Sequence, residues 1–315
     1  MGYSGFDVIG DVHGHADKLV QLLHKLGYRE RDGAYAHPER QAIFVGDFVD
    51  RGPQQWDTVR VARSMVETGS AQAVMGNHEF NAISWYTADP EYPGEFLRQR
   101  GGEKGDKNRH QHAQFLKEVE HLPAQHADMI SWFKTLPLWL DLGDIRVVHA
   151  CWHDEHMLSL RPELAEGQRL TDDLIVSANR KGSPTYQAIE ALTKGLEIPL
   201  PSGVYFHDKD GHRREEIRIR WWDNTVKTYR DHAMLEETIR STIPNLPLET
   251  QMVLPACKVP TFFGHYWMAG RPRILGDNVV CVDYSAGKNG PLVAYRWSGE
   301  SALSDKNFVL SHEIL

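Results

Sequence analysis

Acidic and histidine side chains that could bind metal ions are concentrated in three short segments that each begin with glycine. The segments read GDVHG at positions 10–14, GDFVDRG at positions 46–52 and GNHE at positions 76–79. Asp11 and His13 lie two residues apart on a loop flanked by glycines, and such a tight loop lets both side chains reach one ion. The sequence therefore indicates a metal site with oxygen and imidazole ligands.

Each of these segments follows an apolar run that has the length of a β-strand. The runs are 6–10, 41–45 and 71–75, and the first two are followed by apolar residues at helical spacing, at 19–26 and 56–66. Strands that alternate with helices predict parallel pairing through right-handed crossovers. Because the carboxyl ends of parallel strands meet at one edge of a sheet, we expect the three segments to lie together there.

The rest of the chain predicts two insertions within a single catalytic domain that spans residues 1–315. Aromatic residues among polar segments at 81–144 indicate a mostly helical insertion, and residues 152–259 indicate a long irregular one. Further core strands are expected at 145–148, 262–265, 279–284 and 292–297.

The composition favours a globular cytoplasmic protein. The chain has 315 residues, of which 41% are hydrophobic, and no run of about 18 apolar residues or basic leader is visible. Cys151, Cys257 and Cys281 show no CxxC spacing, which argues against a disulfide framework or a thiolate zinc site. The net charge of -8 argues against sequence-independent binding of nucleic acid.

The histidine clusters at 110–112 and 153–156 lack convergent partners, so we interpret both as solvated faces.

The three segments, in this order, resemble the GDxHG, GDxxDRG and GNHE motifs of the calcineurin-like metallophosphoesterases. The resemblance is to the branch with phosphoprotein phosphatases and bacterial diadenosine tetraphosphatases. His149 in VVHA stands where the family has its HG or HA histidine, and His265 in GHYW matches the GH motif of the bacterial branch. The resemblance implies an α/β fold, a β-sandwich flanked by helices (αββα), with helical and irregular insertions.

The resemblance also implies a centre of two divalent metal ions that share one carboxylate ligand. Oxygen and imidazole donors suit Mn²⁺, with iron or zinc as alternatives, better than Mg²⁺. The implied reaction is direct attack of a metal-bridging hydroxide on phosphorus, without a covalent phosphoenzyme. The implied ligands are Asp11, His13 and Asp47 for one ion, and Asp47, Asn77, His149 and His265 for the other.

Residues next to these ligands are expected to act on the substrate. Arg51 offers a planar fork of donors for the phosphate, which Asn77 also contacts. His78 resembles the general acid of the family, and Asp50 would orient and charge its imidazole. A local salt bridge that shapes the turn is the alternative for Asp50 and Arg51. Glu79 could support the ligands or the start of a helix.

A second phosphate-contacting arginine is expected in the long insertion. Trp222-Asp223 loosely resembles the WSD segment of protein phosphatases, which makes Arg220 and Arg230 candidates for substrate binding. Isoleucine and arginine alternate over residues 217–220, which predicts a strand with one apolar and one basic face. The basic face is either a solvated edge or an anchor for a second anionic group of the substrate.

The leading hypothesis is hydrolysis of phosphomonoesters, either phosphoserine and phosphothreonine in proteins or small phosphorylated compounds. The alternative is symmetrical hydrolysis of diadenosine tetraphosphate to two ADP, at the same metal centre. A nuclease or cyclic phosphodiesterase is less favoured, because the Asp50-Arg51 pair resembles the branch that acts on terminal or anhydride phosphates. A non-catalytic scaffold of this fold would be expected to have lost ligands, and none is lost here.

Overall fold

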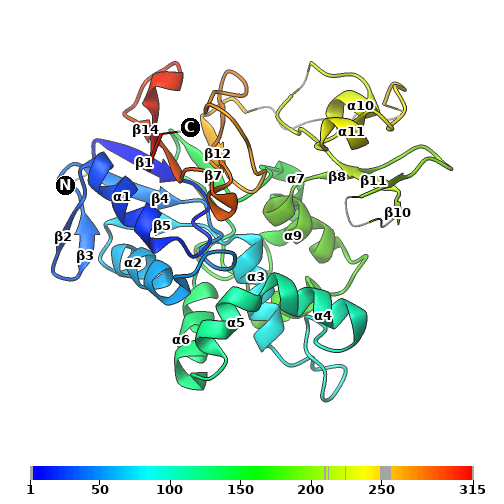
Figure 1. The fold of residues 1–315 in the computed structure, drawn as a ribbon, viewed down its shortest axis with the longest axis horizontal. Helices are drawn as coiled ribbons and strands as arrows, with labels where there is room; N and C mark the ends of the chain where they lie inside the picture. The colour runs from blue at the N-terminus through cyan, green and yellow to red at the C-terminus, as the bar shows by residue number, and fades with distance from the viewer. Residues whose placement is uncertain (1–2, 209–210, 212, 224, 249–256, 314–315) are drawn as a thin grey trace.

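Two β-sheets pack face to face at the centre of the molecule (Figure 1). The computed structural model describes all residues except 1–2, 209–210, 212, 224, 249–256 and 314–315. The five-stranded sheet has the order β15 (Phe308–Leu310), β14 (Val293–Trp297), β1 (Gly5–Ile9), β4 (Arg40–Phe44) and β5 (Ala71–Ala73). The four-stranded sheet has the order β13 (Val279–Cys281), β12 (Thr261–Phe263), β7 (Arg146–Val148) and β6 (Trp139–Asp141).

The three strands that precede the glycine-bounded segments are parallel neighbours, as predicted. β4 pairs with β1 on one side and with β5 on the other, and both pairings are parallel. β14 pairs antiparallel with the free side of β1. The predicted α/β sandwich is confirmed, although the sequence analysis did not predict β6, β15 or the hairpin of β2 (Arg29–Arg31) and β3 (Ala34–Ala36).

The strands bury both of their faces, which explains their nearly continuous apolar sequences. Val8 and Ile43 from one sheet and Phe262 from the other share an apolar cluster between the sheets. The next residues along the strands, such as Ile9 and Phe44, belong to the larger cluster that includes the helices. Each sheet is therefore held between a helical layer and its partner sheet.

Helices α1 (Ala16–Leu26) and α2 (Gln55–Glu67) pack beside the five-stranded sheet, close to the ends of β1 and β4. Leu19, Leu22 and Leu26 form the buried stripe of α1. The helix ends where Gly27 adopts a left-handed conformation, with φ of 92°, that glycine tolerates without strain. The crossover helices thus begin directly after the segments that carry the predicted ligands.

The first insertion is mostly helical, as predicted. Figure 1 shows its helices below the sheets: α3 (Asn77–Tyr86), α4 (Gly102–Gln111), α5 (Ala113–Val119) and α6 (Pro123–Phe133). None of the described helices is long and apolar enough to cross a membrane.

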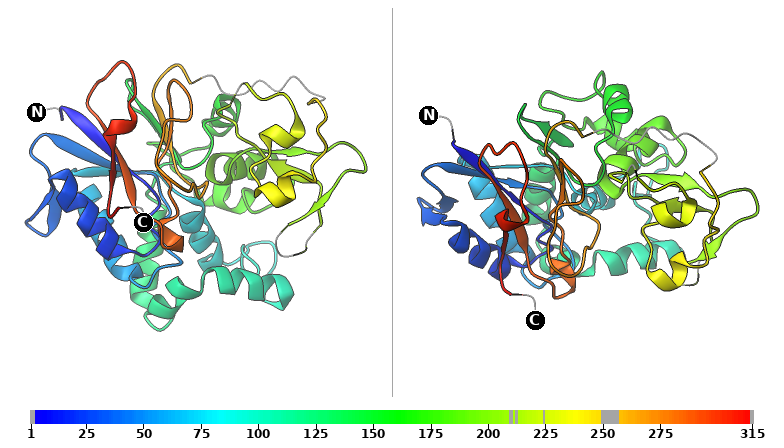
Figure 2. Two further views of the ribbon diagram at one scale, coloured as in Figure 1. Left: turned by 45° about the horizontal axis from the view of Figure 1, so that its top comes forward. Right: turned by 90° about the horizontal axis from the view of Figure 1, so that it is seen from above.

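The second insertion begins with helices and continues as short strands. The helices are α7 (Asp154–Leu160), α8 (Asp172–Ser177) and α9 (Pro184–Lys194), followed by two small sheets and two short helices. The small sheets pair β8 (Glu197–Pro199) with β11 (Glu216–Arg218) and β9 (Phe206–His207) with β10 (Arg213–Arg214). With α10 (Tyr229–His232) and α11 (Glu237–Arg240), they lie on the opposite side of the molecule from α1 (Figures 1 and 2).

Candidate metal centre

The loops after β1 and β4 approach each other through unusual backbone conformations. His13, Asp47 and Asp50 have φ values of 48°, 53° and 70°, in the left-handed region that non-glycine residues rarely adopt. At Gly46 a Cβ atom would lie 2.5 Å from the backbone nitrogen of Gly76, so only glycine permits the second and third loops to touch. The surrounding fold therefore holds strained loops in place around one point.

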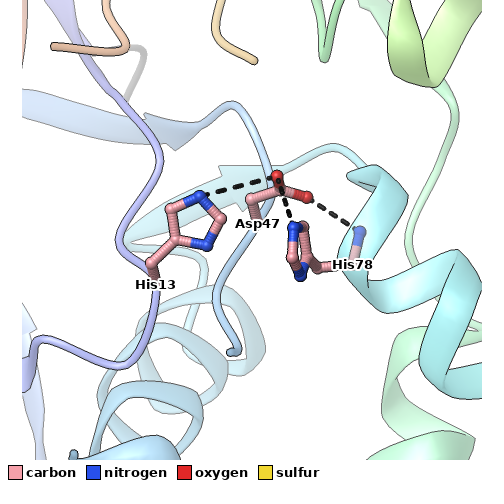
Figure 3. Close-up of side chains that lie close together, drawn as sticks. All are labelled: His13, Asp47 and His78. Atoms are coloured by element: carbon pink, nitrogen blue, oxygen red, sulfur yellow. Dashed lines mark hydrogen bonds and ion pairs between the residues drawn. The ribbon is translucent and has the colours of Figure 1, made fainter. Parts of the chain in front are cut away.

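The carboxylate of Asp47 lies where the loops after β1, β4 and β5 converge. Its Oδ2 atom is 3.3 Å from Nε2 of His149 and 3.8 Å from Nε2 of both His13 and His78. Figure 3 shows the imidazoles of His13 and His78 turned toward this carboxylate from the first and third loops. Asp47 thus has the central position that the sequence analysis predicted for a bridging ligand.

The other predicted ligands surround Asp47. Oδ1 of Asn77 lies 3.2 Å from Nε2 of His149 and 2.8 Å from Nδ1 of His265. Asp11 accepts a hydrogen bond of 3.0 Å from the backbone nitrogen of His265. All six residues predicted as ligands are therefore brought together: Asp11, His13, Asp47, Asn77, His149 and His265.

The orientation of two imidazoles turns one nitrogen of each ring toward Asp47, where it could bind a cation. Nδ1 of His13 donates to the backbone oxygen of Val49 at 3.1 Å, and Nδ1 of His149 donates to that of Val45 at 2.7 Å. Since a carbonyl can only accept, these bonds place the proton on Nδ1 and the lone pair on Nε2. Nε2 of His13 is buried without a hydrogen-bond partner, which is the expected state of a ligand atom directed at a metal ion.

The charges at the centre also fit divalent cations. Burial and the nearby carboxylates of Asp283 and Asp47 raise the pKa of Asp11 well above its ordinary value. Burial and the neighbouring His78 lower the pKa of His13 to about 3, which keeps its imidazole neutral. A cation would relieve the repulsion between the carboxylates and coordinate the neutral imidazole.

A chain of three side chains, two histidines and the carboxylate between them, leads away from the centre. Nδ1 of His78 lies 2.5 Å from one oxygen of Asp50, and Nδ1 of His112 lies 2.8 Å from the other. His112 follows α4 and is only 2% exposed, so our interpretation of residues 110–112 as a solvated face is wrong at this position. Sequence reasoning missed this contact because 62 residues separate His112 from Asp50.

The carboxylates determine the charge of the His78 imidazole. Burial alone would lower the pKa of His78, but Asp47 and Asp50 raise it above the ordinary value. Burial would raise the pKa of Asp50, yet His112 and His78 hold it well below the ordinary value. The protonated form of His78 is therefore favoured beside an ionised Asp50.

Glu79 connects two of the loops. Its carboxylate accepts hydrogen bonds from the backbone nitrogens of Asp47 and Phe48, both at 2.8 Å, and from that of Gly76 at 3.0 Å. The last of these bonds lies at the start of α3. Both alternatives left open for Glu79 therefore describe its position, since it supports a ligand loop and a helix start.

The arginines expected near the phosphate lie in different surroundings. Ile217 and Ile219 are fully buried, which confirms the predicted alternation, and Arg218 points toward the centre. Its Nη1 atom lies 3.3 Å from Nε2 of His265. By contrast, Arg220 lines a neighbouring cavity, and Nε of Arg230 donates to a backbone oxygen in the insertion. Among the described contacts, Arg218 is thus the insertion arginine that reaches a predicted ligand.

Two further residues at the centre were not predicted. The ring of Trp267 stacks on that of His13 with centroids 5.1 Å apart, and the guanidinium of Arg51 lies 5.6 Å from the Trp267 ring. The buried carboxylate of Asp283 accepts hydrogen bonds from the backbone nitrogens of Trp267 and Ser285. Asp283 lies two residues beyond the buried strand β13, and an acid so close to the end of a strand is a signal that could have identified it.

Comparisons with known proteins agree with this geometry. A model of the family described as calcineurin-like phosphoesterase matches residues 5–230. Two curated relatives are named bis(5'-nucleosyl)-tetraphosphatase PrpE, asymmetrical. The one from Halalkalibacterium halodurans is 49% identical over 74 residues, which are 23% of this chain and 30% of the relative. The one from Bacillus velezensis is 31% identical over 152 residues, which are 46% of this chain and 55% of the relative.

The chain thus spans between 30% and 55% of the length of these two relatives. Among solved structures, a protein serine/threonine phosphatase from Saccharomyces cerevisiae has a TM-score of 0.50 and 15% sequence identity. This likeness covers 97% of the present chain and 78% of the yeast chain, and it concerns the fold alone.

Proposed function

The chain belongs to the calcineurin-like phosphoesterase family, and from this premise we propose that it hydrolyses phosphate esters or anhydrides at a centre of two divalent cations. One observation carries the proposal. Six residues with oxygen or imidazole donors converge, with Asp47 at their centre, directly beside an imidazole that is bonded to a buried carboxylate. This arrangement combines a cation site with a proton donor, which are the two components that phosphoryl transfer to water needs.

The side chains around the centre have different roles in the proposed reaction. Divalent cations held by the six donor residues would supply an activated water and neutralise charge on the phosphoryl oxygens. Arg51 and Arg218 approach the centre from different elements, and their guanidinium groups orient the phosphate between them. We assign the role of second arginine to Arg218, in place of the sequence candidates Arg220 and Arg230.

His78 supplies the proton for the leaving group. Its Nδ1 atom is engaged by Asp50, which leaves Nε2 as the atom that faces the centre. As the bond to the leaving oxygen breaks, Nε2 gives its proton to that oxygen, and Asp50 stabilises the charged imidazole before transfer. Asp50 itself keeps its negative charge throughout.

Phosphomonoesters are the first substrate class to test. We expect the protein to hydrolyse p-nitrophenyl phosphate when Mn²⁺ is supplied, and Fe²⁺ and Zn²⁺ should be assayed in parallel. Asp47→Asn should abolish turnover and lower the amount of bound metal, measured by elemental analysis. Wild-type protein that binds metal but hydrolyses neither monoesters nor anhydrides would contradict the proposal.

A dinucleoside tetraphosphate is a second candidate, favoured by the names of the Halalkalibacterium and Bacillus relatives. Symmetrical cleavage to two ADP was the alternative raised by the sequence, whereas both relatives are named asymmetrical. Unequal cleavage of four phosphates must yield a nucleoside monophosphate and a nucleoside triphosphate. Chromatography of the products from diadenosine tetraphosphate distinguishes the two modes, because AMP with ATP shows unequal cleavage and ADP alone shows symmetrical cleavage.

A further inference from the structure

The indole of Trp267 lies directly against the candidate metal centre, on a strained backbone. Trp267 has a φ of 50°, in the left-handed region that a bulky residue rarely adopts. Its backbone nitrogen donates to Oδ2 of Asp283 at 2.6 Å, and that of Met268 donates to the backbone oxygen of Asp283 at 3.1 Å. The indole stacks on the imidazole of His13, with ring centroids 5.1 Å apart and planes 24° apart. The fold therefore holds a large aromatic face on a predicted metal ligand.

The backbone of Arg51 is fixed beside the same ligand, whereas its side chain is exposed. Arg51 has a φ of 72°, and the backbone nitrogen of Gly52 donates to the backbone oxygen of His13 at 2.8 Å. Within the part of the chain that the structure describes, the guanidinium of Arg51 has no hydrogen bond and no ion pair with a carboxylate. A long side chain without such partners loses rotamer freedom when it must hold a phosphate.

Two neighbours contact the side chain of Arg51. The guanidinium carbon lies over the Trp267 ring, 5.6 Å from its centroid, which is within the range of cation–π attraction. At Gly287 a Cβ atom would lie 3.2 Å from Cγ of Arg51, and 3.0 Å from both Cη2 of Trp267 and Cδ2 of His13. The head of Arg51 thus contacts the indole, and its stem passes close to a backbone that carries no side chain.

A second cation lies over the same indole. Nζ of Lys288 is 4.4 Å from the centroid of the Trp267 ring, and among the described residues Lys288 also has no carboxylate partner. Because Lys288 and Arg51 carry like charges, an anion is the counterion that both of them lack. In a chain with a net charge of -8, positive charge without acidic partners beside the centre is a local feature that suits phosphate.

We propose that Trp267 is a positioning residue that holds the guanidinium of Arg51 for contact with the phosphate. The inference rests on the proposed function, in which Arg51 orients the phosphate, and deepens it by assigning the residue that orients Arg51. A carboxylate partner would occupy N–H groups of the guanidinium and neutralise its charge. The indole attracts the cation through its face, so all five N–H donors and the full charge stay available to phosphate oxygens.

The test is a double-mutant cycle with p-nitrophenyl phosphate and saturating Mn²⁺. Trp267→Leu should lower kcat/KM about fivefold, which corresponds to a cation–π contact of about 1 kcal/mol. Trp267→Phe keeps an aromatic face and should recover most of this loss. In the Arg51→Ala background, Trp267→Leu should cause no further loss, because no guanidinium remains to be positioned.

The matched control is Trp56→Leu on α2, which removes an exposed indole. Among the described residues, Trp56 makes no ring contact and no cation–π contact, so this variant should keep the wild-type kcat/KM. Trp267→Met is a second non-aromatic variant, which replaces Trp267→Leu in the cycle if leucine prevents folding.

Three outcomes would overturn the inference. An equal loss from Trp267→Leu with and without Arg51 would show that the indole acts through His13. A lower metal content of Trp267→Leu, measured by elemental analysis, would lead to the same conclusion. A loss in Trp267→Phe as large as that in Trp267→Leu would show that the aromatic face has no part in the effect.

Failure of the proposed function gives a different result. If the wild type binds metal but hydrolyses neither monoesters nor anhydrides, the proposed function fails, and calorimetric titration of the Mn²⁺-loaded full chain with inorganic phosphate tests the inference. Weaker phosphate binding in Trp267→Leu, with no additional effect in the Arg51→Ala background, would support the positioning role. Phosphate binding that Trp267→Leu leaves unchanged would overturn it.

Discussion

His112 holds one oxygen of the Asp50 carboxylate at 2.8 Å, while His78 occupies the other oxygen at 2.5 Å. All three side chains are at least 90% buried. Since each carboxylate oxygen has its own imidazole, the plane of the carboxylate is fixed relative to His78. His112, from the helical insertion, therefore positions the His78 imidazole through Asp50 without facing the centre itself.

Replacing His112 should lower turnover without weakening substrate binding. We expect His112→Phe to reduce kcat about tenfold on phenyl phosphate, a substrate with a poor leaving group, and less on p-nitrophenyl phosphate. His112→Asn keeps a donor close to the position of Nδ1 and should recover part of the loss. Steady-state kinetics of both variants provides the check, and equal losses on the two substrates would assign His112 a purely structural role.

His78→Asn should retain its metal and lose proton donation. The expected loss of turnover on poor leaving groups is about 10² to 10⁴, the usual worth of general acid catalysis. A good leaving group such as p-nitrophenolate needs little protonation, so its loss should be smaller. Elemental analysis must show unchanged metal content. Equal losses for both leaving groups would remove His78 from the acid role.

The pH dependence of turnover should shift when Asp50 loses its charge. Burial lowers the pKa of His78, whereas Asp47 and Asp50 raise it, with a raised pKa as the net result. With His78 as the proposed proton donor, the protonated imidazole is the active form, so we expect activity below this pKa and a fall as pH rises through it. Asp50→Asn removes one of the raising charges, and the alkaline limb of kcat on phenyl phosphate should move to lower pH. A limb at an unchanged pH would show that another group controls it.

Removal of metal should lower the melting temperature. Asp11 is buried near Asp283 and Asp47, and burial together with these charges raises its pKa. A cation that binds only the folded state at 100 times its Kd adds about 2.7 kcal/mol of stability, which chelation removes. Scanning calorimetry with and without EDTA measures the change. An unchanged melting temperature after verified metal removal would be evidence against the assigned ligands.

Glu79→Ala should destabilise the fold by roughly 3 kcal/mol, because three buried backbone N–H groups lose their acceptor. Urea denaturation of the variant gives this free energy directly. Glu67→Ala is the matched control, since Glu67 makes an exposed ion pair with Arg63 that is worth less than about 1 kcal/mol. Similar midpoints for the two variants would contradict the bridging role of Glu79.

The parts of the site that follow strand ends were predictable from sequence. Parallel pairing of β1, β4 and β5 follows from the alternation of strands and helices, and it forces the first three loops together. His149 and His265 were identified by their resemblance to the HG or HA and GH motifs of the family, and they lie directly after β7 and two residues beyond β12. For these residues, the order and direction of the strands determine which side chains lie close together.

Other features depend on packing that no local pattern encodes. The contact of His112 with Asp50 requires the first insertion to fold back on the loop after β4. The period of two over residues 217–220 predicted that Arg218 and Arg220 share a face, but only Arg218 reaches His265. The strands β6 and β15 are only three residues long, too short for a period of two to identify, and they pair with β7 and β14.

The place of β1 between β4 and β14 governs the order in which the nascent chain can complete its fold. After β1 leaves the ribosome, its parallel partner β4 follows soon, but its antiparallel partner β14 ends at Trp297. At about 5 to 20 residues per second, one edge of β1 stays unpaired for roughly 15 to 60 seconds. An unpaired apolar strand invites pairing with other chains. Slow translation or premature termination before residue 293 should therefore yield aggregation and increased dependence on chaperones.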